Sequence, residues 1–229
     1  MPTKLSKYGI ATAIAVLFHA IGFIGIMFFK NSFIVQATPI NLLLMLILLI
    51  WTQKEKNYLF WLFACIAVAA GIAVEMIGVN TKLLFGDYSY GNVLGPKIKN
   101  VPLIIGVNWF IIIYCCGVSV HTLLLKAIEK VSAETATPPV ALKALSVMVD
   151  GATLAVFFDW LMEPVAVKLG YWKWTGDIPF YNYLCWFIVA VVLLLVFHAF
   201  KFNKQNKFAV HLLMIQVMFF LLLRTFLDN

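Results

Sequence analysis

Seven long apolar segments divide the sequence, and they constrain the fold more than any other feature. They run approximately over 8–29, 34–52, 57–79, 102–125, 140–163, 183–201 and 208–227. A helix needs about 20 apolar residues to cross a bilayer, and each segment is close to that length. The sequence therefore predicts an all-α, polytopic membrane protein. Residues 1–229 are expected to form a single integral membrane domain, a bundle of about seven transmembrane helices.

The composition and the distribution of charge agree with this class. Hydrophobic residues make up 63% of the chain and charged residues 12%, whereas a soluble domain has about 25% charged residues. The net charge of +7 comes mostly from lysines spread over short loops, which is typical of topology signals and not of a nucleic-acid interface. Ten of the 17 Lys and Arg residues fall on the side of the N-terminus. This bias predicts a cytoplasmic N-terminus and an outside C-terminus. The expected location is a bacterial inner membrane, as a multi-pass protein.

Three carboxylates lie within or at the ends of apolar segments. Asp159 and Glu163 are four residues apart, so on a helix they share one face, about 40° apart. Glu75 lies near the end of the third segment. An acidic residue near the centre of a membrane costs about 2.5 to 3.5 kcal/mol, which marks it as functional until a structural partner is found. Two close carboxyl groups do not both ionise cheaply, so one of the pair is expected to act as a proton donor.

Two loops rich in aromatic residues, 80–101 and 164–182, fall on the same face of the membrane and resemble each other. The first follows Glu75 and leads to Pro102, with Trp109 seven residues further on; the second follows Glu163 and leads to Pro179, again with a tryptophan seven residues on. This pattern predicts a parallel internal repeat of 57–125 and 140–201. The alternative is that proline favours first helical turns and tryptophan favours membrane interfaces.

The same loops and the helix starts after them supply the candidate substrate-binding residues. These are Tyr88, Tyr90, Asn108, Trp109, Trp172, Trp174, Asn182 and Trp186. An aromatic membrane belt is spread around a protein, whereas these rings crowd into two loops on one face. We expect the loop aromatics to close over a narrow apolar pocket. The two asparagine amides could orient a carboxylate or a water, or form an interhelical hydrogen bond.

No metal site or cofactor is predicted. The four histidines lie on four different apolar segments without HxxxH or ExxH spacing. The four cysteines form no CxxC pair and suit packing in apolar surroundings. No glycine-rich phosphate loop is present.

Three motifs together resemble the membrane carotenoid biosynthesis proteins that hydrate carotenoid end groups. They are ExxGxxTxxxFGxYxY from Glu75 to Tyr90, LGPKIKNVP from Leu94 to Pro102, and DxxxEPVAxxxGYWxW from Asp159 to Trp174, completed by Pro179, Asn182 and Trp186. The resemblance covers roughly residues 71 to 186. Two positions depart from the family pattern: Glu163 stands in place of an aspartate, and Lys82 in place of a glycine. The second departure is expected to add a charge near the site.

The resemblance implies addition of water to the terminal double bond of an acyclic carotenoid end, giving a tertiary alcohol. The substrate would be lycopene, gamma-carotene or a related carotenoid within the lipid bilayer. The residues suit this chemistry, because an acid must protonate the alkene, aromatic faces stabilise the resulting cation, and a polar group must guide water. We expect Asp159 and Glu163 to donate the proton and Glu75 to bind or activate water, as the three catalytic residues.

Two other functions remain open from the residues alone. A carotenoid end-group cyclase begins with the same protonation and lets an internal double bond capture the cation. A small proton-coupled membrane transporter would also use paired carboxylates within a membrane. A retinal protein is excluded, because the last apolar segment, 208–227, has no lysine within its length to form a Schiff base.

Overall fold

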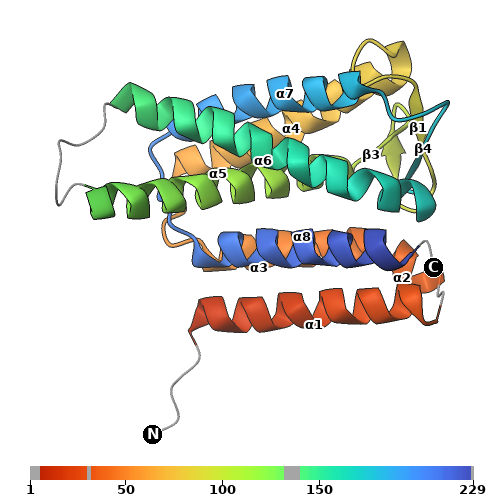
Figure 1. The fold of residues 1–229 in the computed structure, drawn as a ribbon, viewed down its shortest axis with the longest axis horizontal. Coiled ribbons are helices and arrows are strands. Elements are labelled where there is room, and N and C mark those ends of the chain that lie inside the picture. The colour runs from red at the N-terminus through yellow and green to blue at the C-terminus, as the bar shows by residue number, and fades with distance from the viewer. Residues whose placement is uncertain (1–5, 30–31, 132–139, 228–229) are drawn as a thin grey trace, which may run out of the picture.

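The computed structural model describes residues 6–29, 32–131 and 140–227, and these residues form a helical protein (Figure 1). The helices are α1 (Lys7–Met27), α2 (Ser32–Gln36), α3 (Thr38–Thr52), α4 (Tyr58–Thr81), α5 (Ile104–Val131), α6 (Val140–Lys168), α7 (Phe180–Ala199) and α8 (Lys207–Phe226). The short strands are β1 (Tyr88–Tyr90), β2 (Lys97–Ile98), β3 (Val101–Pro102) and β4 (Trp172–Trp174). The predicted all-α class is confirmed.

Six helices are long and apolar enough to span a membrane, so the protein is a multi-pass membrane protein. They are α1, α4, α5, α6, α7 and α8. The predicted second segment, 34–52, differs from this expectation. It is divided between α2 and α3, and α3 has 15 residues, a length of about 22 Å at 1.5 Å per residue. This length is less than the roughly 30 Å of a hydrocarbon core.

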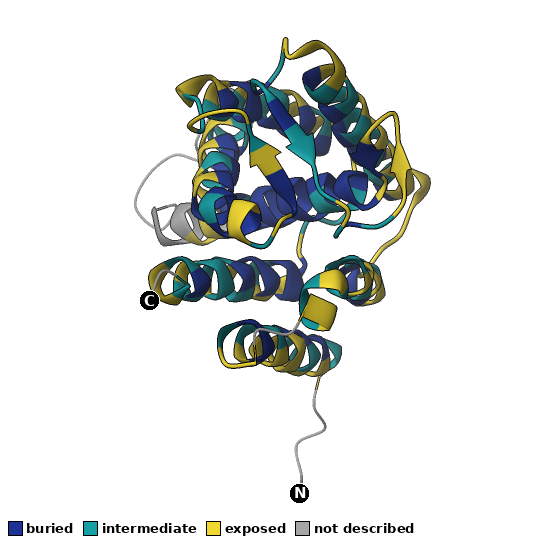
Figure 2. Ribbon diagram, turned by 90° about the vertical axis from the view of Figure 1, so that its right-hand side faces the viewer, coloured by how far each residue is buried: buried dark blue, intermediate teal, exposed yellow. Residues whose placement is uncertain are grey.

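The helices form two groups. Helices α4, α5, α6 and α7 make a bundle, and α1, α3 and α8 lie along one side of it (Figure 1). Helix α5 is the centre of the protein, because every side chain from Trp109 to Cys116 is buried. Figure 2 shows exposed residues on the outer faces of the surrounding helices. In a membrane protein, such exposed apolar faces meet lipid.

Helix ends are set by local hydrogen bonds. Asn57 precedes α4, and its side-chain oxygen accepts from the Phe60 N–H at 3.0 Å, as an N-cap residue does. The same side chain donates to the Lys201 carbonyl at 2.8 Å, which ties the start of α4 to the end of α7. Lys82 ends α4 in the left-handed conformation with φ of 59°, a position that usually favours glycine.

Helix α6 continues past Pro164 to Lys168, whereas the sequence predicted that a loop would begin at this proline. Proline has no N–H, so the carbonyl of Trp160 loses its partner in the helix. Arg224 of α8 replaces that partner: its Nη1 donates to the Trp160 carbonyl at 2.8 Å. The guanidinium also lies 3.9 Å from the centre of the Trp160 ring. A residue from a distant helix thus satisfies the carbonyl that the proline leaves unpaired.

The two aromatic loops meet at one end of the bundle, as predicted. Strand β1 of the first loop pairs with β4 of the second in antiparallel register, with Tyr88 opposite Trp174 and Tyr90 opposite Trp172. Figure 2 looks onto this end and shows the strands in front of the helices. The backbones approach closely beside the strands, where the Gly91 N–H donates to the Tyr171 carbonyl at 2.8 Å. A Cβ at Gly91 would lie 2.1 Å from the Gly170 oxygen, so glycine is required there.

Candidate active site

All eleven site residues predicted from the sequence line one cavity beneath the β1–β4 pair. They are Glu75, Asp159 and Glu163, with Tyr88, Tyr90, Asn108, Trp109, Trp172, Trp174, Asn182 and Trp186. Phe85, Ile105 and Met162 complete the lining. The cavity offers about 20 Å³ to the centres of water molecules, and roughly 10 to 15 Å³ on this measure holds one water. The space suits a water or a very small group. The roles of these residues stay a prediction.

Glu75 is buried and surrounded by hydrogen-bond donors. Its Oε2 accepts from the hydroxyls of Tyr88 at 2.5 Å and Tyr90 at 2.8 Å. Its Oε1 accepts from the indole nitrogen of Trp109 at 3.0 Å. Gly78, one turn along α4, leaves room for this arrangement, since a Cβ there would lie 2.8 Å from the Tyr88 hydroxyl. Three donors therefore hold the Glu75 carboxylate in one orientation.

Glu163 has a similar arrangement with different donors. Its Oε2 accepts from the indole nitrogens of Trp172 at 2.9 Å and Trp174 at 3.0 Å. Asn182 approaches Oε1 at 3.5 Å, the outer limit for a hydrogen bond. The two tryptophans alternate along β4, so both side chains point to the same side of the strand. Strand β4 thus supplies two hydrogen-bond donors to Glu163, as strand β1 does to Glu75.

Asp159 has the fewest donors of the three acids. Its Oδ2 accepts from the amide nitrogen of Asn182 at 2.8 Å. Within the described residues, no other hydrogen bond to Asp159 is found, although only 1% of the residue is exposed. The second oxygen, Oδ1, is therefore free to carry a proton or to meet a bound molecule. The three carboxyl groups share one cavity but differ in the number of hydrogen bonds that they accept from the protein.

The two tyrosines of β1 remain donors at any ordinary pH. Burial, and after it the charge of the neighbouring Glu75, raises the pKa of Tyr88 and of Tyr90 above the usual range of a phenol. Both hydroxyls therefore keep their protons and continue to donate to Glu75. The pH dependence of the site is then not expected to arise from these tyrosines.

Aromatic rings form the walls of the cavity. Trp109 and Trp186, the two tryptophans that follow the prolines by seven residues, stack with centroids 3.8 Å apart and planes 10° apart. Tyr88 and Trp174 lie next to each other across the strand pair, with centroids 5.0 Å apart and planes tilted by 36°. The electron-rich faces of such rings attract cations. The cavity thus combines three acids with a wall of aromatic rings.

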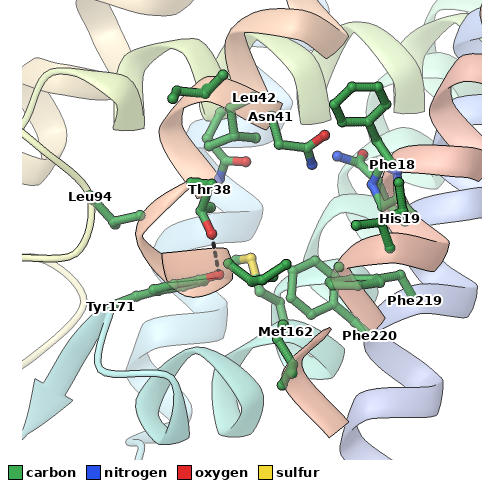
Figure 3. Close-up of a pocket in the computed structure, with 18 of the residues that line it drawn as sticks. Phe18, His19, Thr38, Asn41, Leu42, Leu94, Met162, Tyr171, Phe219 and Phe220 are labelled. Carbon is green, nitrogen blue, oxygen red and sulfur yellow. Dashed lines mark hydrogen bonds between the residues drawn. The ribbon is translucent and has the colours of Figure 1, made fainter. Parts of the chain in front are cut away.

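A second, larger cavity adjoins the first, and the sequence analysis did not predict it (Figure 3). Its volume is about 230 Å³, and its lining is mostly apolar. Four residues line both cavities: Ile105, Asn108, Met162 and Trp172. Helices α1, α2, α3 and α8 supply most of the remaining wall. In the sequence, the signal for this cavity was weak, because its polar residues are neutral and scattered over separate apolar segments.

A hydrogen bond between Thr38 and Tyr171 joins the two parts of the protein at this cavity. The Thr38 hydroxyl donates to the Val35 carbonyl at 2.7 Å and lies 2.7 Å from the Tyr171 hydroxyl, as the dashed line in Figure 3 shows. The tyrosine is therefore the donor to Thr38. Burial raises the pKa of Tyr171 to about 12, so this donor also persists at neutral pH.

Lys82 does not contribute a charge to the site, contrary to expectation. Its Nζ lies 2.6 Å from Asp87 Oδ2, and 61% of its side chain is exposed. The residue lines neither cavity. The left-handed backbone at the end of α4 directs this side chain to the surface, where the ion pair with Asp87 neutralises it.

The fold and the cavity define a multi-pass membrane protein with a buried acidic site under an aromatic cover. A model of carotenoid biosynthesis proteins matches residues 10–228, and the chain belongs to this family. A relative is the bisanhydrobacterioruberin hydratase of Haloarcula japonica, which is 27% identical over 138 residues. The match covers 58% of this chain and 42% of the relative, so it spans less than half of that protein. No solved structure matches the chain.

Proposed function

We propose that this protein hydrates the terminal isoprenoid double bond of an acyclic carotenoid end group. One observation carries the proposal: three buried carboxyl groups with different hydrogen-bond partners share one aromatic cavity, and that cavity adjoins a larger apolar one. The family to which the chain belongs supports a carotenoid substrate, and the name of the hydratase relative supports hydration. The reaction adds water to an alkene and needs no electron transfer.

The larger cavity would hold the apolar chain of the carotenoid. Its rim includes Phe18, Phe33 and Ile40 from α1, α2 and α3, which are 44%, 72% and 68% exposed. Because these exposed apolar residues face lipid in a membrane, a carotenoid could enter sideways between the helices without crossing water. The shared wall at Asn108 and Trp172 would then direct the end group toward the carboxyl groups.

Asp159 is our candidate for the proton donor. A carboxyl group that accepts several hydrogen bonds is stabilised as the anion, and Asp159 accepts only the one from Asn182 among the described residues. The proton would pass from Asp159 to the less substituted carbon of the double bond. The π electrons form the new C–H bond, and a tertiary cation remains at the neighbouring carbon. A general acid placed in this way typically contributes 10² to 10⁴ in rate.

Glu75 is our candidate for the base that receives a proton from water. Its three donors favour the carboxylate form. A water in the small cavity would attack the cation through its oxygen and release one proton to Glu75. Asn108, which lines both cavities, would orient this water. The proton would return to Asp159 by way of Glu163, so that each cycle consumes one water and leaves all three acids as they began.

The aromatic walls would protect and stabilise the cation. The stacked Trp109 and Trp186 and the pair of Tyr88 and Trp174 line the small cavity. Cation–π attraction is worth about 2 kcal/mol or more where water is excluded. The small volume would also limit the number of waters that reach the cation to about one, which favours a single product.

We infer that the N-terminus lies in the cytoplasm and the site lies toward the opposite face. Lys54, Lys56 and Lys201 gather at the end of the bundle remote from the strands, where Asn57 binds the Lys201 carbonyl. Positive residues favour the cytoplasmic side. Single cysteines introduced at Lys54 and Lys173 should be labelled from opposite sides of sealed vesicles by a reagent that does not cross membranes. Labelling from the same side contradicts the inference.

Pigment analysis tests the proposed reaction directly. The protein is produced in cells that accumulate lycopene or gamma-carotene. The carotenoids are then separated, and their molecular masses are measured by mass spectrometry. Hydration adds the mass of one water for each end that reacts. An isomer of unchanged mass identifies a cyclase and rejects the hydratase. The Asp159→Asn variant, produced at the same level in the membrane, should leave the substrate unchanged.

A further inference from the structure

The larger cavity contains a group of polar side chains that the proposed reaction does not use. His19 of α1, Asn41 of α3 and Gln216 of α8 line it, among mostly apolar neighbours. His19 is 7% exposed and Gln216 is 5% exposed. Figure 3 shows Asn41 and His19 on one side of the cavity, away from Tyr171 and Met162. The group therefore lies on the wall that α1, α3 and α8 provide.

One ring contact and one helical spacing relate Gln216 to His19. The His19 ring packs edge to face on Phe219, with centroids 5.3 Å apart and planes 85° apart. Phe219 lies three residues after Gln216 on α8, and residues three apart share a helix face. Gln216 and His19 thus line the same cavity from two neighbouring helices, and Asn41 lines it from α3.

These side chains present hydrogen-bond acceptors without donors. The Oδ1 of Asn41 and the Oε1 of Gln216 are buried and have no partner among the described residues. His19 Nδ1 lies 2.7 Å from the Ala15 carbonyl, which can only accept, so Nδ1 carries the proton. In the neutral ring, Nε2 is then an acceptor, and no hydrogen bond to it is found in the described part of the chain. Buried polar groups are almost always paired, so this wall lacks a partner.

We infer that this polar group binds a hydroxyl group of the carotenoid end that occupies the cavity. A hydroxyl donates one hydrogen bond and accepts others, so it can pair with an amide oxygen and with an amide N–H₂ at the same time. The inference rests on the proposed function for the identity of the ligand. The cavity of 230 Å³ continues into the carboxyl site through Asn108 and Trp172. The hydroxyl therefore belongs to the same end of the molecule as the reacting double bond.

This subsite would place the enzyme after another reaction. An end group that already carries a hydroxyl must come from an earlier addition of water or of oxygen to the carotenoid. The polar wall would then select that product over the parent hydrocarbon, because a hydrocarbon leaves the buried amides and His19 unpaired.

Binding of short probes tests the subsite without requiring turnover. The purified protein in lipid nanodiscs is titrated with a C15 isoprenoid alcohol and with the hydrocarbon of the same skeleton, and binding is followed by quenching of tryptophan fluorescence. We expect the alcohol to bind about tenfold more tightly, the value of one good hydrogen bond. Asn41→Leu and Gln216→Met keep similar volumes and remove the acceptors, so each should bring the two affinities close together.

Phe18→Leu is the matched control, since Phe18 lines the same cavity without polar atoms. It should change both affinities by the same factor and preserve their ratio. Equal binding of alcohol and hydrocarbon by the natural protein overturns the subsite. An unchanged ratio in both polar variants also overturns it and indicates that the amides hold only a structural water. If the alcohol is preferred but neither the hydrocarbon carotenoids nor carotenoids with a hydroxyl on the end group are hydrated, the subsite stands and the hydratase is rejected.

Discussion

The first unit, α4–β1–α5, and the second unit, α6–β4–α7, build the site in parallel ways. In each, a glutamate near the end of a long helix accepts hydrogen bonds from two alternating aromatic residues of the strand that follows. Glu75 accepts from tyrosines of β1, and Glu163 accepts from tryptophans of β4. The tryptophans of the two units then stack on each other. These likenesses support the parallel internal repeat, which stays a prediction.

The units differ at the position four residues before each glutamate. The second unit has Asp159, held by Asn182. The first unit has Gly71, where a Cβ would lie 2.6 Å from the Trp109 side chain. In the first unit, the glycine at this position leaves space for a tryptophan. In the second unit, the same position carries an additional acid. The comparison indicates that similar frames place two similar carboxylates, and that the second unit adds a third acid, which we propose as the proton donor.

The largest effect is expected from removing that difference. Asp159→Asn keeps the size and the hydrogen bond from Asn182 but cannot donate an acidic proton. We expect a loss of about 10² to 10⁴ in the rate of hydration, and Glu75→Gln should be comparably damaging if it is the base. The rate is measured with purified protein in lipid vesicles that contain the carotenoid.

Asp150→Asn is the control for this comparison. Asp150 lies on the same helix, but it is exposed and accepts a hydrogen bond from Ser146. It should retain the natural rate. If Asp159→Asn also turned over carotenoid at the natural rate, the carboxylic acid mechanism and the asymmetry of the two units would both be wrong.

The next prediction tests whether the position of Tyr88 beside Glu75 in the first unit matters for activity. In Gly78→Ala, the added methyl group meets the Tyr88 hydroxyl at 2.8 Å and Phe85 at 2.9 Å, so Tyr88 must move away from Glu75. A displacement of about 1 Å in a catalytic arrangement can cost about 10²-fold in rate. Gly176→Ala is the control, because no atom lies within 4 Å of a Cβ there. Similar activity of the two variants would show that the position of Tyr88 does not matter for turnover.

A smaller effect separates the contributions of the two strands. Trp174→Phe keeps an aromatic ring but removes the indole N–H that binds Glu163, and Tyr90→Phe removes the hydroxyl that binds Glu75. Each carboxylate keeps at least one other donor, so we expect about a tenfold loss, which corresponds to about 1.4 kcal/mol. Trp61→Phe, on the exposed face of α4, should have no effect. Full activity of both site variants would make these aromatics membrane-belt residues.

The parts of the site that could be predicted are those that a membrane segment rarely contains. Asp159, Glu163 and Glu75 are costly in apolar surroundings, and the aromatic residues crowd into two loops. The order of the segments placed those loops on one face. Pairing across β1 and β4 could not be predicted, because three-residue strands carry almost no periodic signal.

The larger cavity could not be predicted for a different reason. His19, Asn41 and Gln216 are single neutral residues in three separate apolar segments, and such residues usually form interhelical hydrogen bonds. Their convergence depends on how α1, α3 and α8 pack. The short length of α3 was also hidden, because 34–52 is mostly apolar although it contains Gln36, Thr38 and Asn41. The chain breaks into two helices between Gln36 and Thr38.

The smallest expected effect concerns Arg224, which helps α6 of the second unit to continue through Pro164. Helix α4 of the first unit contains no proline and needs no such partner. Arg224 supplies the donor that the proline lacks and stacks on Trp160, one turn from the acids. Arg224→Gln should therefore lower the free energy of unfolding by about 1 to 2 kcal/mol, measured as thermal unfolding in detergent. Lys207→Gln, at the exposed start of the same helix, removes an equal charge and should leave stability nearly unchanged. Because the unpaired Trp160 carbonyl lies between Asp159 and Glu163 in the chain, activity should fall only modestly, as α6 loosens at the acid pair. Equal stability of the two variants would mean that Arg224 does not compensate for the proline.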